Sequence, residues 1–161
     1  MQNLTSLTQL PNGCVTNKGM GFDGLGTRGT ARFTFDTATV DSLKASNKTV
    51  AAHGTGVRLP ANAVVIGGFV EVNVPFTSAD STATIAISVV SANDIITAAA
   101  VSGAPYSTKG LKAITPKNNT PEATGIKVTA EKEIVCTVAV QALTAGKLTG
   151  FLDYVISATT P

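Results

Sequence analysis

The sequence predicts an all-β fold, an antiparallel two-sheet β-sandwich of jelly-roll type with an extended N-terminal arm. Apolar and polar residues alternate over several short stretches, as in half-buried strands. Clusters of Gly, Pro, Asn and Asp separate these stretches at short spacing, and the pattern gives seven to nine strands without a long helix. The chain of 161 residues exceeds the roughly 100 residues of an immunoglobulin domain, which favours a jelly roll.

We predict an arm and glycine-rich loop over residues 1–29 and the sandwich over residues 30–161. Three leucines of the arm, Leu4, Leu7 and Leu10, are spaced by three, but the residues between them have poor helix propensity. The arm carries few core-type residues otherwise. We therefore expect it to lie extended and these leucines to contact a neighbouring subunit.

Glycines in the loop reproduce the spacing of a dinucleotide-binding motif, at Gly19, Gly21 and Gly24. The context does not fit, because no apolar strand precedes them and a strand, not a helix, follows. Without a helix N-terminus there is no amide cradle for a pyrophosphate. We expect a turn-rich loop and no cofactor.

Two strands are predicted in the first part of the sandwich. The first directs Ala31, Phe33 and Phe35 inward, and the second, within residues 49–59, places Val57 and Leu59 on one face. A polar loop, residues 37–48, joins them.

The longest alternating run follows the turn at Leu59 and Pro60 and continues to Ser78. Because it exceeds the usual strand length, we expect a bend at Gly67-Gly68 and a central place in one sheet. We expect residues 82–91 to be its antiparallel neighbour. The residues expected on one face of the run are Val64, Ile66, Gly68, Val70, Val72, Val74 and Phe76.

Residues 92–102 are predicted to hold a short helical turn, capped by Asn93 or Asp94, and then extended chain, although the alanine run could equally be an irregular strand. A short strand is predicted over residues 111–115. A C-terminal hairpin is expected to follow, with strands over residues 133–141 and 148–156.

The turn of that hairpin is predicted at residues 143–146, with Gly146 at a positive φ. The first strand directs Cys136 inward, and the return strand directs Leu148 and Leu152 to one face and Phe151 and Val155 to the other. We expect a subunit contact to cover Phe151 and Val155.

Composition argues against several kinds of function. Charged residues make up 14% of the chain, the net charge is +2, and the Lys and Arg residues are scattered. Nucleic acid is therefore not an expected partner, and neither is a membrane, because no apolar stretch is long enough to span one. The N-terminus lacks the features of a signal peptide, which suggests synthesis in a cytoplasm.

No catalytic or metal-binding pattern emerges from the side chains. The single histidine, His53, has no partner of its own type, and a structural role is expected for it. Cys136 is expected to be a buried thiol, and a disulfide to Cys14 is left open but disfavoured in a reducing compartment. Glu131 and Glu133 are interpreted as a solvated strand edge. The sequence therefore predicts no enzyme, no metal and no cofactor.

Three strings carry a family resemblance: LPANAVVIGGFVEV, SANDI followed by GAPYSTKGLKAITP, and TGIKVTAEKEIVCTVAVQALTAGKLTGFLDYVIS. Together they resemble virion structural proteins of tailed bacteriophages, of the capsid decoration or cement (head-associated) type. The likeness extends from Ala31 to Ser157. It implies a homotrimer that binds the major capsid protein on the capsid surface, made in the cytoplasm of an infected bacterium.

An alternative function is a phage fibre or tail-associated module that binds a host-surface carbohydrate. Sandwich domains often bind sugars through exposed aromatic rings, and Tyr106 and Tyr154 are the candidates for that role.

Overall fold

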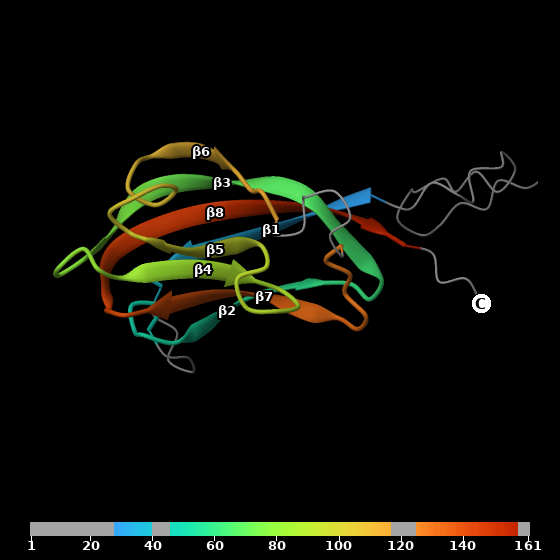
Figure 1. Ribbon diagram of the computed structural model, residues 1–161, viewed down its shortest axis with the longest axis horizontal. Coiled ribbons are helices and arrows are strands. Elements are labelled where there is room, and N and C mark those ends of the chain that lie inside the picture. Colours follow the sequence, from blue (N-terminus) through green and yellow to red (C-terminus); the bar gives the residue numbers. More distant parts are fainter. Residues whose placement is uncertain (1–27, 40–45, 117–124, 158–161) are drawn as a thin grey trace, which may run out of the picture.

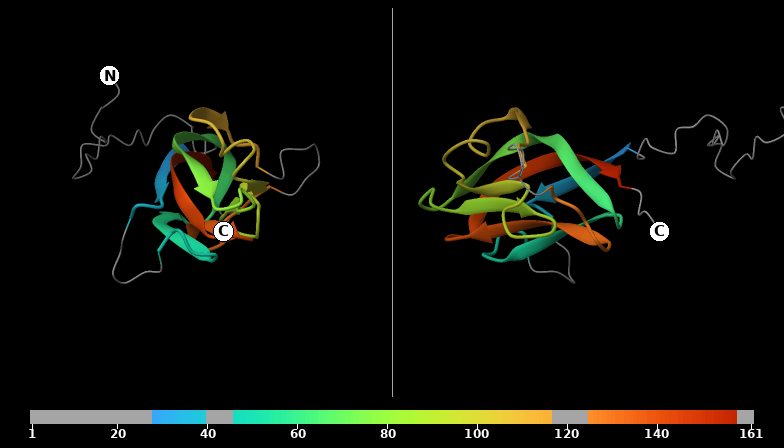
Figure 2. Two further views of the ribbon diagram at one scale, coloured as in Figure 1. Left: turned by 90° about the vertical axis from the view of Figure 1, so that its left-hand side faces the viewer. Right: turned by 45° about the vertical axis from the view of Figure 1, so that its right-hand side comes forward.

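The computed structural model describes residues 28–39, 46–116 and 125–157, and these residues form two packed four-stranded antiparallel sheets (Figures 1 and 2). The regular elements in these ranges are all strands, which confirms the predicted all-β sandwich. They are β1 (Arg28–Asp36), β2 (Ala52–Leu59), β3 (Ala63–Ser78), β4 (Thr84–Ser88), β5 (Ile96–Ala100), β6 (Gly110–Ala113), β7 (Lys132–Ala139) and β8 (Leu143–Ile156).

The strand order identifies the sandwich as a jelly roll. One sheet has the order β1-β8-β3-β6 and the other β2-β7-β4-β5. The first strand pairs with the last, the second with the seventh, the third with the sixth and the fourth with the fifth, all antiparallel. These four pairs form one long antiparallel ribbon that folds over itself. The β3–β8 pair completes the first sheet and the β4–β7 pair completes the second.

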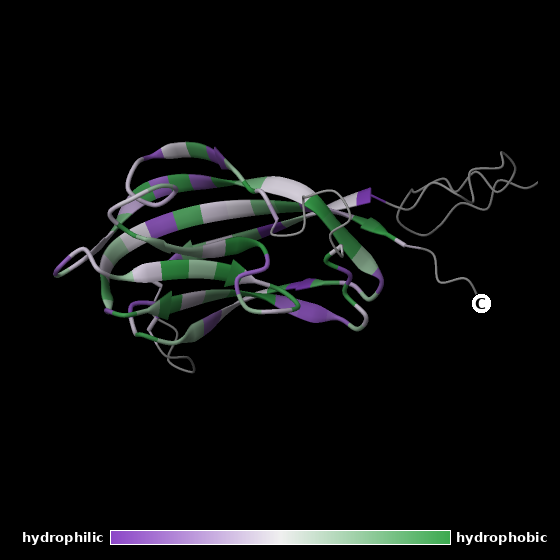
Figure 3. Ribbon diagram, in the orientation of Figure 1, coloured by the Kyte–Doolittle hydropathy of each residue, from purple (hydrophilic) through white to green (hydrophobic). Residues whose placement is uncertain are grey.

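The alternation predicted for the early strands is confirmed. Phe33 and Phe35 are buried in β1, whereas Arg32 and Thr34 are exposed. In β2, Leu59 is buried and Val57 is half-buried, and Arg58 between them is exposed. Figure 3 shows the same alternation of apolar and polar residues along β3 and β8.

The bend in β3 is confirmed, but the predicted inward face is correct only after it, for Val70, Val72 and Phe76, since Val74 is 42% exposed. Gly67 and Gly68 have φ of 152° and 145°, and the pairing with β8 shifts register between Val65 and Gly67. The irregularity changes the parity of the buried side chains. Ala63 and Val65 are therefore buried before the bend, and Val64 and Ile66 lie on the outer face.

Two predicted strand pairings are wrong. β3 does lie inside its sheet, but its neighbours are β8 and β6, and β4 belongs to the other sheet. Residues 133–141 and 148–156 form no hairpin either, because β7 and β8 also lie in different sheets. The chain changes sheets at Val140, with a φ of 69°, and the predicted turn at residues 143–146 is the start of β8. Alternation shows which face of a strand is buried. It does not show whether two strands pair within one sheet or face each other across the core.

The alanine run after β4 forms a strand, β5, which is the alternative left open by the sequence, and the predicted helical turn before it is wrong. Asp94 caps the turn between β4 and β5 and no helix. Its carboxylate, 3% exposed, accepts three hydrogen bonds of 2.8–2.9 Å from the N–H groups of Val89, Val90 and Ser91. This buried anchor lies in the SANDI string.

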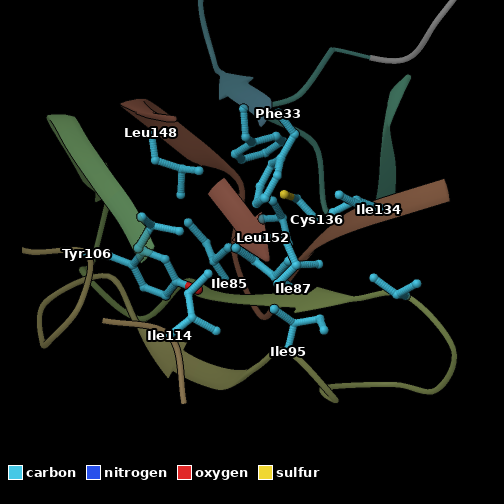
Figure 4. Packing of buried hydrophobic residues seen from close by; sticks show 14 of the residues in the cluster. Phe33, Ile85, Ile87, Ile95, Tyr106, Ile114, Ile134, Cys136, Leu148 and Leu152 are labelled. Atoms are coloured by element: carbon cyan, nitrogen blue, oxygen red, sulfur yellow. The ribbon is translucent and has the colours of Figure 1, made fainter. Parts of the chain in front are cut away.

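The core lies between the sheets, and side chains from both converge in it (Figure 4). A row of rings crosses it: Tyr106 packs edge-on against Phe76, Phe76 stacks on Phe35, and Phe35 contacts His53, with centroid separations of 5.7, 6.0 and 5.9 Å. His53 is 5% exposed and its Nε2 donates to the Thr49 carbonyl over 2.8 Å. Its role in the described structure is a packing one, as predicted.

Cys136 is a buried free thiol, as expected, and burial raises its pKa to about 12. Cys14, the glycines Gly19 to Gly24 and the arm leucines Leu4, Leu7 and Leu10 lie outside the described residues. The boundary between arm and sandwich therefore stays a prediction.

Candidate assembly surface

A row of large side chains crosses the outer face of the sheet β1-β8-β3-β6. The strand register places Arg32 of β1 opposite Phe151 of β8, Phe151 opposite Phe69 of β3, and Phe69 opposite Ala113 of β6. Residues at matching register positions share a face of the sheet. The row therefore spans all four strands on the side that faces away from the core.

The two rings of this row stack on each other. Phe69 and Phe151 have centroids 4.6 Å apart and an interplanar angle of 26°. The Arg32 guanidinium carbon lies 5.9 Å from the Phe151 centroid, within cation–π range. Such a pair contributes about 0.5–1.5 kcal/mol beyond its buried area. Both rings remain half-buried in the single chain.

Other apolar side chains surround the row. Val155 of β8 pairs with Val64 of β3, and both are half-buried on the outer face. Ile66, beside the bend, is 42% exposed, and Leu111 of β6 is 64% exposed. The outer face thus combines two aromatic rings, an arginine and four aliphatic side chains.

Several polar groups of this face are paired with one another. Lys147 Nζ lies 3.0 Å from Asp36 Oδ2, and Thr30 Oγ1 donates to Asp153 Oδ1 over 2.5 Å. Partial burial raises the pKa of Asp36, but the Ala38 N–H and the Lys147 ammonium outweigh it and hold the pKa below its usual value. Pairing lowers the desolvation that these groups would undergo when covered.

The outer face of the other sheet has a different character. Its cross-strand pairs join small side chains, as Thr84 with Ala139, Ala86 with Thr137, and Ser88 with Val135. Aromatic side chains are absent from these pairs, so this part of the face is only weakly apolar. The aromatic character of the outer surface is therefore concentrated on β8 and β3.

The sequence placed two of the proposed contact residues, Phe151 and Val155, on this outer face, and the structure brings them together with Phe69 and Val64. The sequence analysis did not select Phe69, although the position of this residue in the alternating pattern indicated it. Phe69 has the parity opposite to Val70 and Val72, which are buried. An aromatic residue on the polar side of a strand is a candidate contact. Arg32 and Leu111 became visible only once the register was known.

The described residues offer little for chemistry. No three His, Cys, Asp or Glu side chains come together there in a way that would hold a metal ion. Glu131 forms an exposed ion pair with Arg58, 3.0 Å, and Glu133 accepts the Gly56 N–H over 2.6 Å, which supports β2 where its pairing shifts. None of the described elements is a helix of the length and apolarity needed to cross a membrane.

Tyr106 is not a sugar platform. Its side chain is 0% exposed and burial, followed by the nearby Cys136, raises its pKa well above the ordinary value. A ring buried among Phe76 and its neighbours cannot present a face to a carbohydrate. This removes one of the two tyrosines on which the carbohydrate-binding alternative depended.

Comparison with known proteins identifies the fold among phage capsids. No protein-family model matches the chain, and no curated protein does so either. Three solved structures share its fold. A chain of the cyanophage Pam1 capsid asymmetric unit has a TM-score of 0.57 and 20% identity, and the match covers 94% of this chain and 99% of that one. A chain of the capsid of Ralstonia phage GP4 has a TM-score of 0.58 and 17% identity, with coverage of 85% and 89%. A chain of the acidic stable capsid of Helicobacter pylori bacteriophage KHP30 has a TM-score of 0.55 and 14% identity, with coverage of 83% and 91%.

Proposed function

We propose that the chain is a structural protein of a bacteriophage virion that binds and stabilises the outer surface of the capsid, as a decoration or cement protein. Its partners are the major capsid protein and further copies of itself, arranged as a homotrimer. It is made in the bacterial host cytoplasm and ends on the virion surface. The fold shared with chains of three phage capsids supports a virion role.

The observation that carries the proposal is the outer face of β1-β8-β3-β6. Aromatic residues and arginine are the types enriched in protein interfaces, and Phe69, Phe151 and Arg32 form a connected row there. Covering these rings removes apolar area from water, which contributes about 25 cal/mol per Å². In a homotrimer the three contacts are linked, so the second and third form at a high effective concentration and modest single contacts add up to stable binding.

The role needs no reaction. Neither a nucleophile paired with a base nor a metal cluster is found among the described residues, and a coat acts by contact alone. We therefore propose that the chain is not an enzyme.

Rebinding to capsids tests the proposal. Phage particles made without this protein are mixed with the purified chain, and binding is measured by sedimentation. We expect saturable binding of the wild-type chain and, for the double variant Phe69→Ala/Phe151→Ala, affinity at least about tenfold lower, as for residues at the centre of an interface. Circular dichroism checks that the variant retains its sheets.

Val135→Ala is the matched control, because Val135 is half-buried on the outer face of the other sheet. Its binding should equal that of the wild type. A wild-type chain that does not return to particles rules out the decoration role. Equal binding by the double variant and the control moves the contact away from β8 and β3.

A further inference from the structure

The open side of the sandwich carries a groove of about 490 Å³ between β5 and β6. These are the last strands of the two sheets, and in the end-on view of Figure 2 they lie opposite the side where β1 and β2 meet. Ile96 of β5, Leu111 and Ala113 of β6, and Ala104-Pro105 from the connecting segment line it. Lys112 adds one charge, and its Nζ donates to Thr108 Oγ1 over 3.1 Å.

Within the described residues, the main chain of β6 presents hydrogen-bonding groups without a partner along this groove. Ile114 N–H donates to the Gly68 carbonyl of β3 over 3.0 Å. In an antiparallel ladder the N–H and C=O groups of alternate residues point to opposite sides. Those of Leu111 and Ala113 therefore point away from β3, toward the groove, and β6 has no second strand neighbour among the described residues. Such an edge is a template for an added strand.

We propose that residues 4–10 of a second copy of this chain bind there as a strand added to β6. An added strand has two faces, and both meet apolar surface: Ile96 and Pro105 on the β5 side of the groove, and Leu111 at the rim where β6 meets the outer face, 64% exposed. The sequence of residues 4–10 supplies leucines of both parities, Leu4 and Leu10 on one and Leu7 on the other.

Charge and length also favour this occupant. Residues 1–17 contain no Asp, Glu, Lys or Arg, so no charged side chain would have to be desolvated in an apolar groove. Pro11 follows the segment and cannot donate to a ladder, which defines the end of the added strand. The residues between it and β1 can span up to roughly 50 Å when extended, enough to reach a neighbouring copy.

A second copy fits better than the same one. β1, which the arm precedes, is the edge strand opposite β6 in its sheet, and β1 begins at the end of the sandwich away from β6 (Figure 1). To fill its own groove the arm would have to reverse direction and pass around the sheet. An arm that binds a neighbouring copy does not need to reverse direction. This inference rests on the proposed self-association of the chain and specifies how two copies would contact each other.

Photo-crosslinking of the full chain tests the exchange. A benzophenone-bearing residue replaces Leu7, the chain is prepared in ¹⁴N and ¹⁵N forms, and the two are mixed before irradiation. We expect crosslinks between one light and one heavy chain, attached within residues 95–97 or 111–115. Crosslinks confined to one chain, crosslinks to other surfaces, or their absence would each overturn the proposal.

A pair of surface variants sharpens the test. Leu111→Glu places a charge beside the added strand and should reduce the mixed-chain crosslink at least about tenfold. Val50→Glu is the control, since Val50 is 54% exposed and lies outside the groove, and its yield should be that of the parent. An undiminished yield with Leu111→Glu contradicts the proposal.

Particle binding is measured separately on the same proteins. Mixed-chain crosslinks without binding to capsids would refute the decoration role and leave the exchange standing. Capsid binding with crosslinks confined to single chains would refute the exchange and leave the decoration role standing.

Discussion

At the scale of single residues, buried polar groups fix the parts of the chain that alternation does not determine. Asp94 holds the turn between β4 and β5 by accepting N–H groups from three preceding residues. His53 fastens the start of β2 to the Thr49 carbonyl in a similar way. Neither interaction depends on a partner protein. Folding therefore accounts for Asp94 in the SANDI string, and a likeness in that string indicates a shared turn.

Asp94→Ala should destabilise the chain by roughly 3 kcal/mol, because several buried main-chain N–H groups lose their acceptor. Urea unfolding followed by circular dichroism measures the change. Asp80→Ala is the control: Asp80 is exposed and pairs with Gln141 at the surface, so its variant should stay within about 0.5 kcal/mol of the wild type. Equal stability of the two variants would show that the turn holds without the carboxylate.

At the scale of elements, β3 shows what a sequence pattern can and cannot determine. The bend at Gly67-Gly68 was predictable, since paired glycines in an overlong strand indicate an irregularity. The change of buried parity was not, because it depends on how many residues bulge out of the ladder with β8. The parity of Phe69, opposite to that of the buried Val70 and Val72, already indicated an outward side chain, but its contact with Phe151 was found only through the register.

The two glycines of the bend make a matched pair for a substitution test. Both have positive φ, 152° at Gly67 and 145° at Gly68. A Cβ on Gly68 would meet the Phe151 carbonyl oxygen at 2.1 Å, whereas one on Gly67 would meet nothing within 4 Å. We expect Gly67→Ala to lower the unfolding free energy by roughly 1 kcal/mol through backbone strain alone.

Gly68→Ala should lower it by roughly 3 kcal/mol, because strain and a main-chain collision act together. Thermal or urea unfolding of the two variants gives the difference directly. Equal losses would mean that β8 moves aside easily at this point, contrary to its interior position in the sheet.

At the scale of the whole molecule, the sequence predicted the layers but not how the strands connect. Inward faces were correct for β1, β2 and β7, and these suffice for a sandwich. In a jelly roll most consecutive strands lie in opposite sheets, so the short link at Val140 looks like a hairpin in the sequence although it crosses between layers. The candidate surface could not be assembled from the sequence for the same reason, because its residues come from four strands far apart in the sequence.

Burial of the Cys136 thiol and the Tyr106 hydroxyl makes the folding stability fall at alkaline pH. Burial raises the pKa of the Cys136 thiol from 9.0 to about 12, and it raises that of Tyr106 further. Both groups keep their protons in the folded chain and release them in the unfolded chain once the pH passes their ordinary pKa. The unfolded state then binds fewer protons, so stability falls as pH rises above about 9 and is unaffected by these groups at pH 7.

The thiol contribution can be isolated. At pH 10, one unit above its ordinary pKa, ionisation of the unfolded thiol should remove about 1.4 kcal/mol of stability. In a Cys14→Ser background, which leaves Cys136 as the sole thiol, urea unfolding at pH 7 and pH 10 gives the loss. Adding Cys136→Ala should lower stability at both pH values through the missing sulfur, yet make the loss between them smaller by about 1.4 kcal/mol. Identical losses in both proteins would mean that the thiol ionises as readily in the folded core as in water, and would contradict its place between the sheets.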